Sequence, residues 1–220
     1  MSGRGRLIAL EGVDGCGKST QAARLAGALG ALSTAEPGST ALGKGLRYLF
    51  LDAELPPVSP RAEALLVAAD RAQHVDEVVA PALEGGRWVV TERFSGSTLA
   101  YQGYGRGLDL DELRRLVAWA ARGIAPDLTV LLDVPVAQAR HRRQAAAADR
   151  LERLDDGFHE RVHAGYLALA AADPEGWVVV DGTGDVDTVA RHLLAVVVER
   201  LGPTPEPASA PWSPPPPSSS

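Results

Sequence analysis

The chain has 220 residues, of which 45% are hydrophobic and 23% charged, which is ordinary for a globular protein and long enough for one domain with a single large core. A net charge of −6 argues against a nucleic-acid-binding surface, and no apolar run is long enough to cross a membrane. Without a signal peptide and with a single cysteine, the chain is typical of a cytoplasmic enzyme with no nucleic-acid or membrane partner.

The first predicted elements are a buried strand over residues 6–11 and a helix over 17–29 with apolar residues at helical spacing. Between them, residues 12–19 read Gly-Val-Asp-Gly-Cys-Gly-Lys-Ser, which matches the phosphate-binding pattern G-x-x-x-x-G-K-[S/T]. A glycine-rich turn with a chance lysine is the alternative, but the strand and helix on either side favour the motif. In this setting, backbone N–H groups and the positive end of the helix hold a polyphosphate.

The motif predicts a nucleoside triphosphate site with Mg²⁺ as its cofactor. We expect Lys18, exposed in the loop, to reach the β- and γ-phosphates and the Ser19 hydroxyl to bind the metal. Cys16 is interpreted as a tolerated small residue rather than a redox group. The predicted ATP-binding residues are Gly12, Val13, Asp14, Gly15, Cys16, Gly17, Lys18, Ser19 and Thr20.

Further along the chain, short apolar runs predict buried strands at 88–91, 128–133 and 177–181, with a weaker one at 32–35. Long helical patterns alternate with these runs. The predicted helices cover 17–29, 61–84, 109–122, 135–144, 152–172 and 185–201. Such alternation predicts an α/β fold in which a five-stranded parallel sheet carries helices on both faces and binds its ligand at the carboxyl ends of the strands.

The composition changes near the C-terminus. Residues 203–220 contain eight of the sixteen prolines, with serine and alanine between them. Such a segment buries too little apolar surface to offset the entropy of ordering. We therefore expect a folded domain over residues 1–202 followed by a disordered tail over 203–220.

Four further segments carry a family resemblance. They are Glu-Pro-Gly-Ser-Thr at 36–40, Ala-Ala-Asp-Arg-Ala-Gln-His at 68–74, the stretch at 92–107 that contains Ala-Tyr-Gln-Gly, and Asp-Arg-Leu-Glu at 149–152. In this order, and together with the phosphate loop, they resemble the thymidylate (dTMP) kinase family from about residue 6 to residue 200. The resemblance implies the three-layer fold of P-loop nucleoside monophosphate kinases, a possible homodimer, and transfer of the ATP γ-phosphoryl group to dTMP.

The resemblance also implies roles for residues that bind the acceptor nucleotide. Arg93 would clamp the acceptor phosphate and Arg47 would bind it as well, while Asp14 would accept a hydrogen bond from the sugar 3′-hydroxyl. The residues implied to recognise the deoxynucleoside are Val67, Arg71 and Thr98 at the base and Tyr101 at the sugar 2′ position. The acceptor phosphate is largely dianionic at neutral pH, so the reaction needs positive charge and alignment rather than a strong base.

Arginines around residues 140–153 resemble the family's lid over ATP, and Gly15 stands where another branch of the family has a phosphate-loop arginine. Of this cluster we expect Arg143 and Arg150 to be catalytic, with a solvated helix face as the alternative. The cluster comprises Arg140, Arg142, Arg143, Arg150 and Arg153. Glu92 stands where the family has Asp, and would act on Mg²⁺ through water.

Three departures from the family pattern bear on the acceptor. Val67 replaces a phenylalanine that stacks on thymine, Ala35 replaces an arginine, and Ser39 replaces a glycine. Two alternatives therefore stay open beside dTMP phosphorylation. One is a kinase for another or a modified pyrimidine deoxynucleoside monophosphate, and the other is an inactive nucleotide-binding regulatory paralogue.

Overall fold

The computed structural model describes residues 4–143 and 149–203. The expected disordered tail therefore lies outside the described residues, apart from Pro203, and so does the middle of the expected lid, residues 144–148. Within the described ranges, every helix is too short or too polar to span a bilayer.

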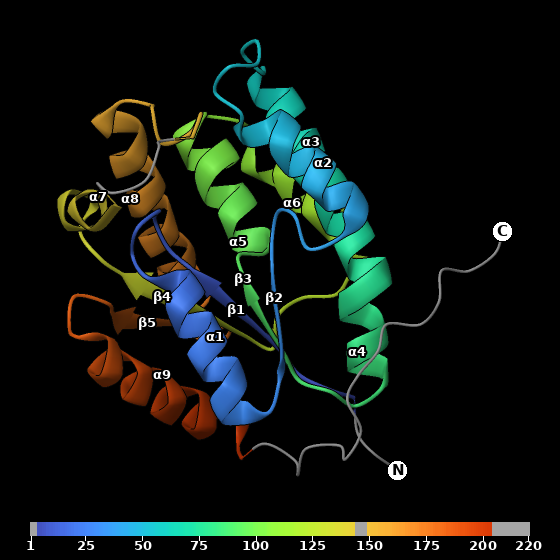
Figure 1. The fold of residues 1–220 in the computed structure, drawn as a ribbon, viewed down its shortest axis with the longest axis vertical. Coiled ribbons are helices and arrows are strands. Elements are labelled where there is room, and N and C mark those ends of the chain that lie inside the picture. The colour runs from blue at the N-terminus through green and yellow to red at the C-terminus, as the bar shows by residue number, and fades with distance from the viewer. Residues whose placement is uncertain (1–3, 144–148, 204–220) are drawn as a thin grey trace, which may run out of the picture.

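A five-stranded sheet lies at the centre of the molecule (Figure 1). The strands are β1 Leu7–Glu11, β2 Leu32–Ala35, β3 Val89–Glu92, β4 Leu128–Asp133 and β5 Trp177–Asp181, and every pair is parallel. Their order is β2-β3-β1-β4-β5, which places β1 in the middle of the sheet. The loop after β1 therefore lies between strands that the chain reaches in opposite directions, and ligands of parallel sheets commonly bind at such a point. The weaker strand prediction at 32–35 is confirmed as an edge strand, β2.

Helices surround the sheet, and several begin at side-chain caps. Each capping side chain accepts a hydrogen bond from a backbone N–H in the first turn of the helix that follows it. These caps are Thr40, Ser59, Asp109, Asp155 and Asp185. The helices are α1 Lys18–Leu29, α2 Ala41–Leu51, α3 Pro60–His74, α4 Ala80–Glu84, α5 Ser95–Thr98, α6 Leu110–Ala120, α7 Val136–Arg143, α8 Asp156–Ala172 and α9 Val186–Leu201, with π-helical turns η1 Val75–Val79 and η2 Leu99–Gly105.

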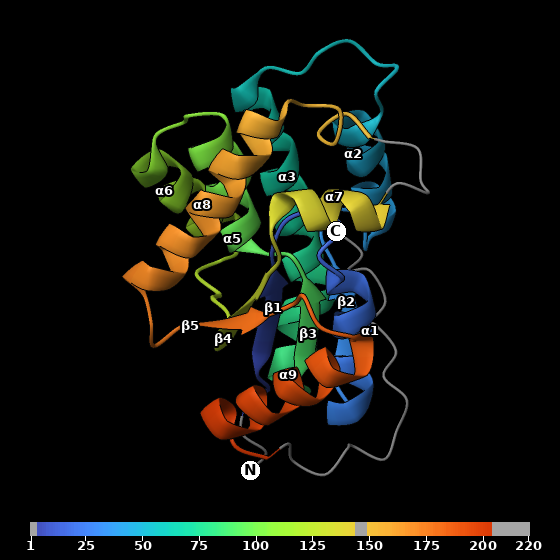
Figure 2. The same cartoon turned by 90° about the vertical axis from the view of Figure 1, so that its left-hand side faces the viewer.

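The two faces of the sheet bury different residues, because side chains alternate along each strand. Ile8 and Leu10 of β1 belong to a core cluster that includes buried residues of α1 and α9. Leu7 and Ala9 belong to a second cluster with residues of η1 and α4. Figure 2 shows α1 and α9 side by side on one face of the sheet. The expected α/β fold with helices on both faces is confirmed.

Three helix predictions needed correction. The helix predicted over 61–84 contains the π-helical turn η1 before Pro81, whose missing N–H cannot make the ordinary bond to residue 77. The helix predicted from residue 152 begins at Asp156, because Asp155 caps it. The glycine-rich stretch 95–105 is helical although no helix was predicted there, because close packing on α8 stabilises it. A Cβ on Gly165 of α8 would lie 2.5 Å from Cγ of Tyr104.

Candidate functional site

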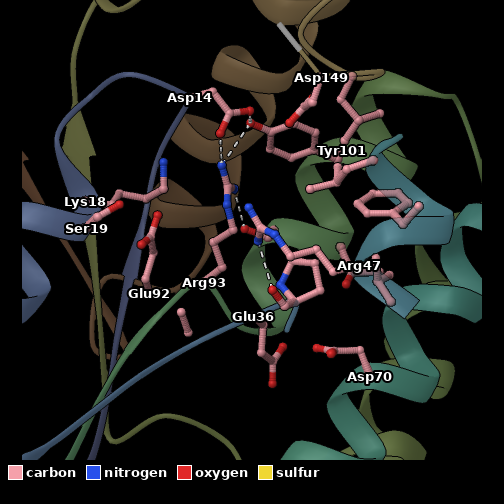
Figure 3. Close-up of a pocket in the computed structure, with 18 of the residues that line it drawn as sticks. Asp14, Lys18, Ser19, Glu36, Arg47, Asp70, Glu92, Arg93, Tyr101 and Asp149 are labelled. Atoms are coloured by element: carbon pink, nitrogen blue, oxygen red, sulfur yellow. Dashed lines mark hydrogen bonds and ion pairs between the residues drawn. The ribbon is translucent and has the colours of Figure 1, made fainter. Parts of the chain in front are cut away.

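A cavity of about 390 Å³ opens at the carboxyl ends of β1 and β3 (Figure 3). Its walls come from the phosphate loop, the turn after β2, α2, α3, the segment after β3, and residues 149–152. The predicted residues that line it are Asp14, Gly15, Gly17, Lys18, Ser19, Thr20, Arg47, Val67, Arg71, Glu92, Arg93, Thr98 and Tyr101. The fold therefore brings most of the predicted site residues into one cavity, from segments far apart in the chain.

The phosphate loop needs its glycines for two separate reasons. Gly12 and Gly15 have φ angles of 144° and 87°, which side chains rarely adopt. A Cβ on Gly15 would also lie 2.2 Å from the carbonyl oxygen of Ala139 in α7. The close approach of α7 therefore excludes any side chain at position 15.

Lys18 differs from its expected state. The residue is 3% exposed rather than exposed in a loop, because it is the first residue of α1 and folds back under the phosphate loop. Its Nζ donates a hydrogen bond to the Val13 carbonyl oxygen at 2.9 Å and lies 3.7 Å from Sγ of Cys16. The loop thus holds the ammonium group in place, and Cys16 contributes a packed sulfur to that arrangement.

Arg93 lies at the centre of the cavity, between Asp14 and Tyr101 (Figure 3). Its guanidinium forms an ion pair with Asp14, donates to Ser97 Oγ at 2.9 Å, and donates to the hydroxyls of Tyr101 and Tyr166 at 3.3 Å. Burial opposes its charge, but the surrounding acidic groups, Asp14 foremost, raise the pKa of Arg93 well above its usual value. Its φ of 67° is unusual for a side-chain-bearing residue and marks a strained position.

Sequence reasoning missed the group that holds this arrangement, Glu11. Its carboxylate is 0% exposed and accepts backbone N–H bonds from Phe94 and Ser97 at 2.9 and 3.0 Å. Its Oε2 also accepts hydrogen bonds from the hydroxyl groups of Ser97 and Tyr166, at 2.6 and 3.1 Å. Burial raises the pKa of Glu11, against the hydrogen bond from Ser97 and the charge of Arg93. The sequence carried one sign of such a role, because Glu11 is a charged residue at the end of an otherwise apolar predicted strand.

The other end of the cavity is built around Arg71, which is 2% exposed. Its Nε donates to Glu36 at 2.8 Å, and its terminal nitrogens donate to Thr98 Oγ1 at 3.0 Å and to the Phe94 carbonyl at 2.8 Å. Val67 lies on the same helix and lines the cavity, partly buried. The three residues expected at the base, Val67, Arg71 and Thr98, therefore lie together.

A second buried network continues from Glu36. Its other oxygen lies 2.9 Å from Nδ1 of His74, whose Nε2 lies 2.7 Å from Thr34 Oγ1. Asp70 accepts the Gly38 N–H at 2.9 Å through one oxygen, while its buried second oxygen has no hydrogen-bond partner among the described residues. Burial and the neighbouring Glu36 carboxylate raise the pKa of Asp70 to about 6. Sequence reasoning assigned no role to this group.

The expected lid arginines make different contacts. Arg140 pairs with Asp156, and Arg142 donates to the carbonyl oxygens of residues 182 and 183, both at 2.9 Å. Arg150 donates to backbone carbonyls at the end of α2. Arg143 ends α7, and its side chain lies outside the described part of the structure.

A magnesium ion is compatible with the donors present. Ser19 and Glu92 both line the cavity beside Lys18 and offer a hydroxyl and a carboxylate oxygen (Figure 3). Mg²⁺ prefers oxygen ligands, and commonly takes only one or two from protein with the rest from phosphates and water. Within residues 4–143 and 149–203, no group of three His, Cys, Asp or Glu side chains suited to a metal occurs.

Comparison with known proteins places this geometry in a family. The sequence model of the family Thymidylate kinase matches residues 10–193. The thymidylate kinase of Synechococcus sp. (strain JA-2-3B'a(2-13)) is 51% identical over 202 residues, which cover 89% of this chain and 95% of that protein. The thymidylate kinase of Clavibacter sepedonicus is 49% identical over 198 residues, which cover 87% and 93%.

A solved structure agrees with the sequence comparisons. The crystal structure of thymidylate kinase from Ehrlichia chaffeensis superposes with a TM-score of 0.72 at 27% identity, covering 88% of this chain and 99% of that one. Fold, phosphate loop and sequence similarity over most of the length thus agree, and the chain belongs to the thymidylate kinase family.

Proposed function

We propose that the protein transfers the γ-phosphoryl group of ATP to the 5′-phosphate of dTMP, giving dTDP and ADP. One observation carries the proposal: Arg93, held by the partly buried carboxylate of Asp14 and by buried tyrosine hydroxyls, lines the same cavity as Lys18 of the phosphate loop. Two cationic anchors in one cavity suit two phosphorylated substrates that must be held in line despite their repulsion.

On the donor side, the phosphate loop and the start of α1 bind the ATP phosphates through backbone N–H groups, with Lys18 beneath them. Ser19 would hold Mg²⁺, with Glu92 acting on it through water, and the bound ion would supply positive charge to the phosphates of ATP. Arg143 at the end of α7 is the lid residue that we assign to the charge developing during transfer.

On the acceptor side, Arg93 and Arg47 bind the 5′-phosphate, Asp14 accepts the 3′-hydroxyl, and Tyr101 excludes a 2′-hydroxyl. Arg71 and Thr98 recognise the base against Val67. An oxygen of the acceptor phosphate attacks the γ-phosphorus while the bond to the β–γ bridging oxygen breaks and ADP leaves. A dianionic acceptor has no proton to lose, so no residue is needed as a base.

The test is a coupled assay of ADP release with dTMP, dUMP, dCMP and a larger 5-substituted pyrimidine deoxynucleotide as acceptors. We expect the highest kcat/KM with dTMP and only background ADP release without an acceptor. Activity with none of them would favour the regulatory paralogue. Val67 favours a larger pyrimidine as the second candidate, because an aliphatic side chain leaves more room than phenylalanine, and preference for the 5-substituted acceptor would establish it.

We further infer a homodimer in the cytoplasm. Leu65 on α3 and Trp119 on α6 are 60% and 81% exposed, and their two helices pack together. The inference rests on the resemblance to the thymidylate kinase family, and these exposed apolar side chains are free to contact a second copy of the chain. Light scattering on the purified protein tests the dimer, and a monomer at micromolar concentration would contradict it.

A further inference from the structure

Arg150 makes an unusual set of contacts for an arginine expected over ATP. Its terminal nitrogens donate to the carbonyl oxygens of Asp52 at 2.7 Å, Leu55 at 3.3 Å and Leu49 at 3.4 Å. Its backbone N–H also donates to the Leu51 carbonyl at 2.9 Å. Among the described residues, Arg150 therefore holds the end of α2 and the start of the following loop through main-chain oxygens.

The last carbonyls of a helix have no donor within the helix, and their partial negative charge favours a cation. At the end of α2, Asp52 N–H satisfies the Tyr48 carbonyl, while Arg150 satisfies those of Leu49 and Leu51. A planar guanidinium can reach several carbonyls at once, which a single ammonium cannot do with the same geometry. Arg150 thus acts as a C-terminal cap for α2 supplied by a distant segment.

The end of α2 matters because one face of this helix forms a wall of the cavity. Arg47, Phe50 and Leu51 all line the cavity, at the three- and four-residue spacing of one helical face. Arg47 donates to the Pro37 carbonyl at 2.9 Å, which joins the helix to the turn after β2. Leu151, next to Arg150, is 5% exposed and lines the same cavity.

We propose that Arg150 is a positioning residue for the acceptor nucleotide: it fixes α2 and thereby sets Arg47 against the acceptor phosphate. This inference rests on the proposed function and replaces the transition-state role expected for Arg150 from the sequence. Its guanidinium holds the end of the helix that forms the acceptor wall, so its loss weakens dTMP binding even when no ATP is present. A transition-state arginine would instead lower kcat and leave dTMP binding unchanged.

The test is calorimetric binding of dTMP, without ATP, to the wild type and to Arg150→Ala, Arg150→Lys and Arg114→Ala. Arg114 is the matched control, because it forms an exposed ion pair with Asp111 on α6 and does not contact α2. We expect Kd for dTMP to rise about tenfold in Arg150→Ala and less in Arg150→Lys, with no change in Arg114→Ala. The KM for ATP should stay within about twofold of the wild type.

A double-mutant cycle separates positioning from general destabilisation. If Arg150 acts through Arg47, then Arg150→Ala should weaken dTMP binding much less in an Arg47→Ala background than in the wild type. Additive effects in the cycle, or an unchanged dTMP Kd in folded Arg150→Ala, would overturn the inference. If Arg150→Ala does not fold, the same cycle is run with Arg150→Lys. Failure of wild-type protein to bind dTMP would overturn the proposed function instead.

Discussion

The two halves of the cavity are built in contrasting ways. The half that we propose for the donor is one continuous segment, residues 12–20, whose expected ligand groups are mainly backbone N–H groups between β1 and α1. The half that we propose for the acceptor gathers Arg47, Arg71 and Arg93 from three separate elements. Each of these arginines donates to protein oxygens, and for Arg71 and Arg93 these include buried or partly buried carboxylates.

This difference indicates where function and stability are coupled. In the donor half, a substitution changes the ligand contact and little else, because the loop geometry comes from its glycines. In the acceptor half, Arg71 and Arg93 also form ion pairs with carboxylates, so the loss of either arginine removes an ion pair of the folded state. We therefore expect donor-half variants to lose activity with modest changes in stability, and acceptor-half variants to change both.

The largest effect is expected for Lys18→Met in the donor half. Methionine fills the space of the buried stem and removes the charge near the γ-phosphate, so kcat should fall about 10³-fold. Calorimetric dTMP affinity should not change, because the acceptor half is untouched. Lys44→Met is the control, since Lys44 is exposed on α2 and does not line the cavity. Wild-type kcat in folded Lys18→Met would refute the donor assignment.

Arg93→Ala should impair the use of the acceptor nucleotide. Losing a charged contact to the acceptor phosphate in a dry site costs about 2–5 kcal/mol, so kcat/KM for dTMP should fall about 30-fold or more while the KM for ATP changes little. The melting temperature should also fall, because Asp14 loses its ion-pair partner.

The control for this variant is Arg122→Ala. Arg122 is the other described non-glycine residue with positive φ, at 51°, and it forms an exposed ion pair with Asp76 away from the cavity. The control therefore measures the effect of removing an arginine from such a backbone conformation. A defect of Arg93→Ala confined to ATP binding would assign Arg93 to the wrong substrate.

Val67→Phe tests the proposed contact between α3 and the base of the acceptor. An aromatic stack on a base is worth about 1–3 kcal/mol, so the dTMP KM should fall roughly 5- to 150-fold with little change in kcat. Val67→Leu adds volume without an aromatic face and should give a much smaller gain. If Phe at this position abolishes activity while Leu does not, the natural acceptor is larger than dTMP.

The smallest effect concerns stability and Asp70. The pKa of Asp70 is about 6 in the folded protein, above the ordinary aspartate value of 3.8, so the folded state binds the proton more tightly than the unfolded chain does. The stabilisation from this proton is complete below about pH 4 and is lost as the pH rises through 6. Asp70→Asn keeps an oxygen for the Gly38 N–H and carries no charge. At pH 8 it should raise the melting temperature by roughly 3–6 °C.

The same variant should show a clearly smaller gain at pH 4.5 than at pH 8, because at pH 4.5 the folded wild-type carboxyl is still largely protonated and only part of its stabilisation has been lost. Asp76→Asn, on the exposed part of η1, is the control and should show no such pH dependence. Equal melting temperatures of the wild type and Asp70→Asn across pH 4.5–8 would show that the carboxylate is not destabilised by its surroundings.

Much of the fold was predictable because its signals are local. Apolar runs bounded by turn residues predicted all five strands, including the weak β2, and helical spacing predicted α1, α6, α7, α8 and α9 to within a few residues. The glycine-rich helix over 95–105 was not predictable, since its stability comes from the fit of Tyr104 and Phe158 against glycines on the opposing segment. Helix propensity of the segment itself argues against it.

The sequence by itself determined the phosphate loop, because backbone geometry there depends on glycines at set positions in one continuous stretch. Through family resemblance it also predicted the arginines that we propose for the acceptor half. Only the tertiary structure decided how they are held: Glu11 beneath Arg93, Glu36 beside Arg71, and Arg150 at the end of α2 rather than free above the cavity. Burial, charge pairing and the supply of donors to orphan carbonyls depend on which distant segments meet, and no local pattern encodes that.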